Sequence, residues 1–310
     1  MDTHERGYRS GTINTDALGF RYSHLAGKRF SVAERGGSAR VNLLVGGSTA
    51  LGVGASSDAH TVASCLSMLT GEVWLSLAGC GYNASQELMM FVDHQHRFGR
   101  IGHVVVLSGL NTLAREALGD PWSSGQPAQP TSLLQRLRRV LAPPRGACPA
   151  LEIAPLSLPD KRLAGAADSI GRAMQQWQRL LAGSQASLTF ILQPLLPWCR
   201  GTPPLGEQRM LKSLEKQPRH FDHLLAGVLD NQLHAEFFGR IKDQCEPVRC
   251  HDMNSMLSSS PVFAENLFID RLHFNDLGNN ALAKVIIARL GLVQEKRPNR
   301  RVTPIKLVRD

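Results

Sequence analysis

Four short runs of branched aliphatic residues constrain the fold most strongly, because each run is apolar at consecutive positions rather than at every second one. The runs cover residues 41–46, 73–78, 103–109 and 187–193, and a weaker fifth candidate covers 247–253. Strands that are apolar on both faces are typical of a parallel sheet with helices on each side. Helical patterns separate these runs, so the sequence predicts an α/β fold with right-handed crossovers.

The helical patterns between the strands have recognisable ends. Asn83 and Gln86 are spaced as an N-cap and its N3 partner, which predicts a helix that begins directly after Asn83. We expect Asp168 to cap a further helix. Apolar spacing predicts two more helices, one over residues 221–238 and one over residues 281–290.

The residues that follow the first three strands have side chains suited to catalysis. Gly46-Gly47-Ser48, Gly79-Cys80-Gly81 and Gly109-Leu110-Asn111 follow the three strands in turn. The ligand site of an open parallel sheet lies at the carboxyl ends of its strands, so we expect these segments to meet. A hydroxyl group, exposed glycine backbone and a side-chain amide are the parts of an acyl-transfer site, with a nucleophile and donors for an oxyanion.

A candidate base and its orienting carboxylate lie near the end of the chain. Asp270 precedes His273 by one turn, so its carboxylate can accept the imidazole Nδ1–H and leave Nε2 free to take a serine proton. Each piece alone has a simpler interpretation: a strand-to-helix turn at Ser48, a helix N-cap at Asn111, and a local turn at Asp270 and His273. The pieces together, in this order, predict a catalytic site.

These segments resemble the sequence blocks of the SGNH-hydrolase superfamily, the GDSL-like esterases and lipases. Residues 45–49 resemble block one, residues 77–82 block two, residues 109–112 block three and residues 270–278 block five. The resemblance spans residues 13–290, and Asn14 with residues 18–21 resembles an N…GFR lead-in. It implies a three-layer α/β/α sandwich of about five parallel strands, a flavodoxin-like SGNH fold with an elaborated helical middle region.

The resemblance also implies a role for each candidate residue. Ser48 would be the nucleophile, His273 the general base and Asp270 the carboxylate that orients it. The oxyanion hole would comprise Ser48, Gly81 and Asn111.

The sequence departs from the family pattern at two positions. Gly47 stands where the family name has Asp, and Thr112 stands where block three usually has Asp. The first departure removes no proton-transfer group. The second keeps Asn111 but weakens the support for its orientation.

These roles predict a serine esterase-type hydrolase that cleaves an ester or thioester of a small acyl group on a metabolite, glycan or lipid through an acyl-enzyme. Two alternatives stay open: an O-acyltransferase that uses the same acyl-serine, and a non-catalytic binding or regulatory protein of the same fold. The expected partner is a small-molecule acyl ester or thioester. The mechanism needs no metal and no organic cofactor, and the sequence does not indicate an oligomeric state.

The length of 310 residues suits one large domain. We expect a lead-in over residues 1–35, the hydrolase domain over 36–294 and a basic tail over 295–310. Within the domain, residues 119–186 and 199–246 are expected to form helical insertions or a cap.

Charge and cysteine content argue against several other classes. Much of the net charge of +9 lies in residues 133–142 and 295–310, so nucleic acid is not the favoured partner. The six cysteines are expected to be free thiols, and Cys245, Cys250 and His251 indicate zinc only weakly because no second pair accompanies them. No apolar run is long enough to cross a bilayer and the start lacks a secretory pattern, which predicts a cytoplasmic protein.

Overall fold

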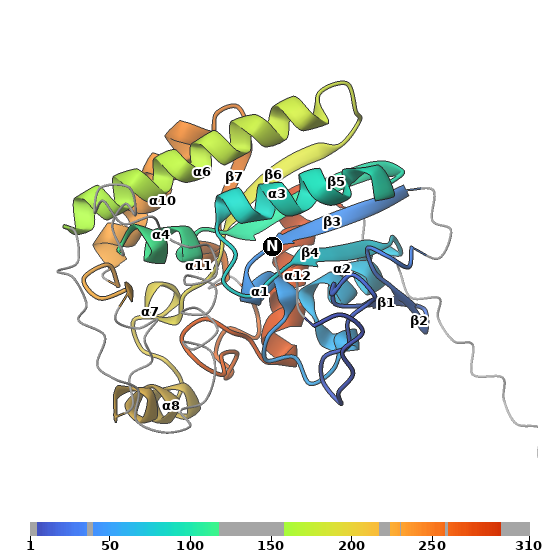
Figure 1. Cartoon of the computed structure of the whole chain (residues 1–310). Coiled ribbons are helices and arrows are strands. Elements are labelled where there is room, and N and C mark those ends of the chain that lie inside the picture. Colours follow the sequence, from blue (N-terminus) through green and yellow to red (C-terminus); the bar gives the residue numbers. More distant parts are fainter. Residues whose placement is uncertain are drawn as a thin grey trace, which may run out of the picture.

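A parallel five-stranded sheet in the order β4-β3-β5-β6-β7 organises the described part of the chain (Figure 1). The computed structural model describes residues 5–35, 40–117, 158–216, 224–229, 231–257 and 260–292. The strands are β3 (Arg40–Gly46), β4 (Trp74–Ala78), β5 (Arg100–Ser108), β6 (Ser187–Leu192) and β7 (Arg249–Asp252). All five aliphatic candidates therefore contain a strand, and the predicted fold class is confirmed.

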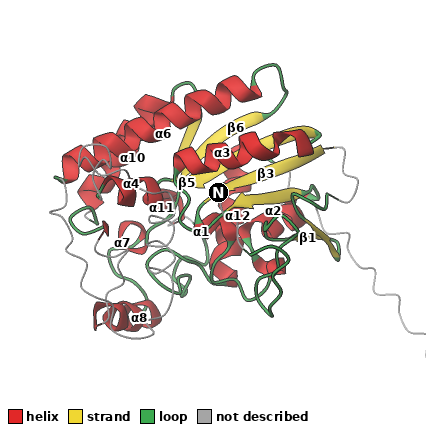
Figure 2. Ribbon diagram, in the orientation of Figure 1, coloured by secondary structure: helices red, strands yellow, loops and turns green. Residues whose placement is uncertain are grey.

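Helices cover both faces of the sheet, as Figures 1 and 2 show. On β3, Leu43 and Val45 face one apolar core and Leu44 faces the other. The first core includes α3 (Ala84–His94), α4 (Leu110–Glu116), α6 (Pro159–Leu181) and α10 (Asn231–Cys245). The second includes α1 (Ser48–Leu51), α2 (Val62–Thr70), α7 (Leu196–Cys199), α11 (Met253–Met256) and α12 (Asp276–Leu290), and α8 (Leu205–Lys216) packs against it. The strands are buried on both faces because each face carries its own helical layer.

Helix ends follow the sequence signals in some places and not in others. The capping box of Asn83 and Gln86 is present at the start of α3. The predicted cap at Asp168 is wrong, because α6 begins at Pro159 and Asp168 lies inside it. The helix predicted over 221–238 is not continuous, because residues 225–229 are not helical and α10 runs over Asn231–Cys245.

The N-terminal segment lies against the sheet and α2. It contains an antiparallel pair, β1 (Ser23–Leu25) and β2 (Lys28–Phe30). The Ser23 hydroxyl donates to the Trp74 carbonyl at 2.5 Å, and the His24 amide donates to Ser64 Oγ at 3.0 Å. These bonds fix the lead-in beside β4 and α2.

Several predictions from the sequence lie outside the described residues. They concern most of the middle region before Leu158, including residues 133–142, and the basic tail over 295–310. Within the described residues, no helix has the length and apolarity that a bilayer crossing requires.

Candidate active site

Ser48 is the first residue of α1, two positions after the end of β3, which pairs with β4 and β5 in the sheet. The turn before it depends on two glycines, since a Cβ at Gly46 would lie 2.1 Å from the Leu107 carbonyl oxygen, and one at Gly47 would lie 2.4 Å from Asn111 Nδ2. Gly46 also has a φ of +154°, which L side chains rarely adopt. The chain can therefore turn sharply here and place the Ser48 side chain at the carboxyl edge of the sheet.

The structure joins Ser48, His273 and Asp270 in one chain of hydrogen bonds. His273 Nε2 lies 2.7 Å from Ser48 Oγ, and His273 Nδ1 lies 2.7 Å from Asp270 Oδ2. Ser48 is 9% exposed and His273 is 3% exposed, so bulk water scarcely competes for these bonds. With Nδ1–H donated to the carboxylate, Nε2 is left to accept the serine proton.

The second oxygen of Asp270 is bound by the backbone of the same turn. The amides of Leu272 and His273 each donate to Asp270 Oδ1 at 2.8 Å. Burial by itself raises the pKa of Asp270, but the His273 side chain and these two amides outweigh burial and lower the pKa to about 2. The carboxylate is therefore ionised across the neutral range.

Thr49 ties α1 to the turn that carries His273, and Gln193, which follows β6, is bonded to Thr49 in turn. Thr49 Oγ1 donates to the Leu272 carbonyl at 3.2 Å and accepts from Gln193 Nε2 at 3.1 Å. The residue after Ser48 is thus bonded to the residue before His273. Neither contact is predictable from the sequence, because no motif signals that a threonine or a glutamine makes such a bond.

The two remaining candidates lie beside the nucleophile turn. Gly81 has a φ of +75°, and its loop is held against the turn by a hydrogen bond from the Gly79 amide to the Gly46 carbonyl at 3.1 Å. Asn111 lies in the first turn of α4, and its Nδ2 donates to the Tyr82 carbonyl at 2.9 Å. One proton of this amide is engaged there, and its second proton is available for a ligand. All five predicted site residues therefore come from segments that meet at one edge of the sheet.

The departure at Thr112 has a structural counterpart. Thr112 Oγ1 accepts the Ala84 amide at 3.1 Å and so links α4 to the start of α3. This contact, together with the bond from Asn111 to Tyr82, connects the segments of blocks two and three. The orientation of Asn111 therefore has support without an acidic neighbour at position 112.

A buried carboxyl group lies behind these two segments. Glu87 in α3 is 0% exposed and accepts the Ser108 hydroxyl at 2.6 Å. Burial raises the pKa of Glu87 to about 8, although the bond from Ser108 opposes this. Glu87 is therefore protonated in the folded protein at neutral pH.

Replacing Glu87 with glutamine is expected to stabilise the protein at pH 8 much more than at pH 5. The unfolded carboxyl loses its proton above about pH 4.3 while the folded one keeps it to about pH 8, so stability falls as the pH rises between these values. Glutamine removes this fall and keeps an acceptor for Ser108. Urea unfolding at both pH values should show a difference on the order of 1–3 kcal/mol; equal effects at both would contradict a buried neutral acid.

The structure does not place Cys245, Cys250 and His251 in a set of zinc ligands. Cys245 ends α10 and Cys250 lies in β7. Among the described residues, no group of three or more His, Cys, Asp or Glu side chains gathers closely enough to hold a metal ion.

Comparison with known proteins gives matches at the level of structure only. No known family profile matches the sequence, and no curated protein matches it. A lipase/acylhydrolase from Enterococcus faecalis is similar, with 14% sequence identity and a TM-score of 0.41. The match covers 84% of this chain and 100% of that chain. A lipase from a goat rumen metagenome is similar, with 12% sequence identity and a TM-score of 0.46. The match covers 83% of this chain and 99% of that chain. An acetyl xylan esterase is similar, with 12% sequence identity and a TM-score of 0.42. The match covers 81% of this chain and 99% of that chain.

The fold and the positions of the candidate residues agree with the architecture that the sequence resemblance implied. It is a parallel α/β/α sandwich with Ser, His and Asp hydrogen-bonded in series at the carboxyl edge of its sheet. Sequence blocks one, two, three and five occupy that edge in the order that the resemblance implied. The chain has the parallel α/β/α architecture that the resemblance to the SGNH hydrolases implied.

Proposed function

We propose that this protein is a serine hydrolase that cleaves a small acyl ester or thioester through an acyl-enzyme. The observation that carries the proposal is the hydrogen-bond series from Ser48 through His273 to Asp270, with 2.7 Å at each link. Nucleophile, base and orienting group in direct contact are the arrangement that activates a serine hydroxyl at neutral pH. The buried, ionised Asp270 stabilises the imidazolium that forms when His273 accepts a proton.

The reaction then follows in two halves. Ser48 Oγ attacks the carbonyl carbon while its proton passes to His273 Nε2, and the oxyanion is bound by the amides of Ser48 and Gly81 and by Asn111 Nδ2. Collapse of this intermediate breaks the bond to the leaving alcohol or thiol, which takes the proton from His273. Water attacks the acyl-serine with His273 again as base, and the acid leaves with Ser48 restored.

A fluorophosphonate probe tests the proposal directly. We expect the probe to form a phosphonyl ester on Ser48 of the folded wild type, located by mass spectrometry of the digested protein, and no adduct on Ser48→Ala. Turnover of p-nitrophenyl esters from acetyl to octanoyl then gives the preferred acyl length. A folded wild type that neither labels nor turns over any ester would contradict the proposal and favour a binding protein of the same fold.

The same acyl-enzyme serves hydrolysis and transfer, so product analysis separates them. With an ester substrate and an added alcohol acceptor, a hydrolase releases free acid in proportion to the substrate consumed. Release of an acylated acceptor in place of acid would assign the protein as an acyltransferase.

Replacing Gly47 with alanine is expected to reduce kcat by displacing Asn111. The backbone at Gly47 is extended, with a φ of −85°, so its conformation suits alanine as well as glycine. The Cβ of alanine would nevertheless lie 2.4 Å from Asn111 Nδ2, so the Asn111 side chain would have to move. Loss of one oxyanion donor costs about 10²–10³ in kcat, and we expect this loss for Asn111→Ala and a smaller one for Gly47→Ala.

The double variant decides whether the two losses share a cause. If Gly47→Ala acts through Asn111, adding it to Asn111→Ala changes kcat by less than about twofold. Independent, multiplicative losses would show that Gly47 affects the site in another way.

A further inference from the structure

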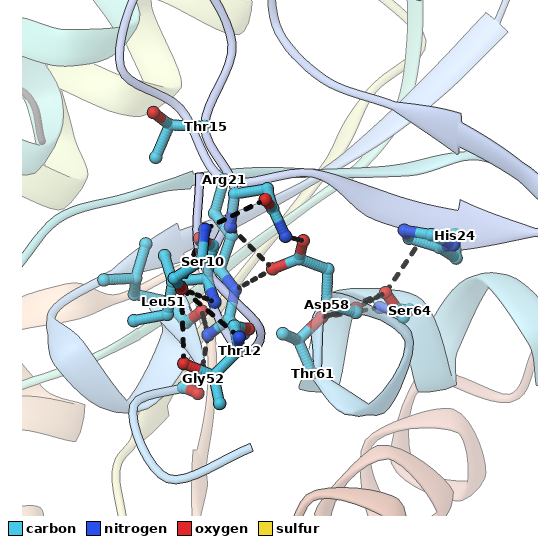
Figure 3. A network of polar contacts seen from close by, with 12 residues as sticks. Ser10, Thr12, Thr15, Arg21, His24, Leu51, Gly52, Asp58, Thr61 and Ser64 are labelled. Atoms are coloured by element: carbon cyan, nitrogen blue, oxygen red, sulfur yellow. Dashed lines mark hydrogen bonds and ion pairs between the residues drawn. The ribbon is translucent and has the colours of Figure 1, made fainter. Parts of the chain in front are cut away.

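A buried ion pair lies at the end of the nucleophile helix α1 (Figure 3). Arg21, from the lead-in, is 1% exposed, and its Nε donates to Asp58 Oδ1 at 2.7 Å. A buried guanidinium is costly unless its charge and its donors are all matched, so the position of Arg21 is closely determined by its partners.

Arg21 also binds the backbone of α1. Its Nη1 donates to the carbonyls of Leu51 at 3.2 Å and Gly52 at 2.8 Å. Leu51 is the last residue of α1 and Gly52 is its C-cap, while Ser48 is its first residue. The guanidinium therefore holds the opposite end of the same single helical turn that carries the nucleophile.

A helix of this length cannot fix its own orientation. Only a few backbone bonds lie within the turn, among them Leu51 to the Gly47 carbonyl and Gly52 to the Ser48 carbonyl, both at 3.0 Å. A single turn forms at an entropic cost that so few bonds do not recover. The contacts made by Arg21 supply part of the missing constraint.

The partner of Arg21 is itself firmly held. Asp58 accepts the Asn14 amide at 3.2 Å and Asn14 Nδ2 at 2.7 Å, so both of its oxygens are bound. The Asp58 carbonyl accepts the Ser64 hydroxyl at 2.5 Å, which joins it to α2. Figure 3 shows Arg21 and Ser64 on either side of Asp58. The two lead-in residues singled out in the sequence, Asn14 and Arg21, thus meet at one carboxylate.

We propose that Arg21 is a positioning residue for the nucleophile: by binding the last carbonyls of α1, it holds Ser48 Oγ at hydrogen-bond distance from His273 Nε2. Asp58 and Asn14 set the position of Arg21. The inference rests on the proposed function, because it concerns the reactivity of Ser48. A shift of about 1 Å in a reacting group, caused by a change away from the chemistry, can cost about a hundredfold in rate.

The chain offers a matched control in Arg162. This second arginine is also 1% exposed, and it donates to the carbonyls of Leu224 and Ala226 from α6. Arg21 and Arg162 thus each bind two carbonyls of one local segment, but only the segment bound by Arg21 contains Ser48. Loss of either arginine disturbs the core, and only loss of Arg21 disturbs the nucleophile.

The test compares Arg21→Met, Arg21→Lys and Arg162→Met at a temperature where circular dichroism shows each to be fully folded. The readouts are the second-order rate constant of fluorophosphonate labelling and the kcat and KM of ester turnover. For Arg21→Met we expect labelling and kcat to fall about tenfold to a hundredfold with KM within about twofold, since Arg21 lies behind the helix end. For Arg21→Lys, which keeps the charge but loses the planar fork, we expect a fall of about threefold to tenfold. Arg162→Met should stay within about twofold of wild type even where its Tm is lower.

The outcomes separate the two proposals. Wild-type rates in folded Arg21→Met overturn the positioning role, as does an equal loss in Arg162→Met. If Arg21→Met does not fold, Arg21→Lys decides by the same criterion. Absence of labelling in the wild type overturns the proposed function itself, and the role of Arg21 falls with it.

Discussion

Replacing His273 with alanine is expected to lower kcat for ester hydrolysis by about a millionfold, nearly to the level of Ser48→Ala. The three groups of such a triad act as a unit, so loss of the base costs about as much as loss of the whole triad. In this chain the reason is the hydrogen bond between His273 Nε2 and Ser48 Oγ, whose heavy atoms lie 2.7 Å apart. Stopped assays with a chromogenic ester, extended over hours, measure the residual rate.

A second His–Asp pair provides the control for this prediction. His234 Nε2 lies 2.8 Å from Asp252 Oδ2, and both side chains are buried. His234→Ala therefore removes a similar pair without touching Ser48, and we expect kcat to stay within about threefold of wild type. Substantial activity in His273→Ala, or an equal loss in His234→Ala, would contradict the assignment of the base.

Asp270→Asn is expected to lower kcat by about 10⁴ while leaving the fold in place. The amide oxygen can still accept the two backbone N–H groups that now bind Oδ1, so the side chain keeps its orientation. Its NH₂ group then faces His273 Nδ1 as a donor, which forces the imidazole proton onto Nε2. The nitrogen that should accept the serine proton is thereby occupied.

The same substitution also has a predictable effect on stability. Because the pKa of Asp270 is lowered to about 2, its carboxylate stabilises the folded protein above about pH 4, and this contribution is lost as the pH falls toward 2. Urea unfolding at pH 6 and pH 3 should show a steeper loss for the wild type than for Asp270→Asn. Parallel losses would mean that the carboxylate is not specially stabilised in the fold.

The sheet and the triad could be predicted from the sequence because their signals are local. Strands that are buried on both faces are written as aliphatic runs, and a carboxylate and an imidazole one turn apart are visible at Asp270 and His273. The strand β7 is short and mostly polar, and for that reason the sequence indicated it only weakly. The position of Ser48 after a strand and the resemblance to the SGNH sequence blocks then singled it out as the candidate nucleophile.

Two predicted helix boundaries were wrong, and the physical reason for each lies in the nearby residues. Apolar spacing over residues 221–238 suits a helix, but Gly227 has a φ of +78°, which no right-handed helix accommodates. Asp168 is a good cap by residue type, yet Pro159 at the first helical position starts α6 earlier. A residue that favours a helix end does not create one when the helix extends beyond it.

The supporting contacts of the site could not be predicted, because they join distant segments. Arg21 and Asp58 lie 37 residues apart, and Gln193 reaches Thr49 from 144 residues away. A single sequence contains no periodicity that pairs such positions. The lead-in motif pointed to Asn14 and Arg21 as residues of note without indicating what they bind.

The distance along the chain between Ser48 and His273 has a consequence for folding. The two bonded side chains are separated by 225 residues, and the strands β5, β6 and β7 all lie between them in the sequence. Such a contact closes a very long loop, and contacts of this kind form late because the entropy of closure has to be met before they are gained. Under the proposed function, the Ser48 hydroxyl becomes nucleophilic only after His273 is in place, so a polypeptide released before residue 273 would carry an unreactive serine.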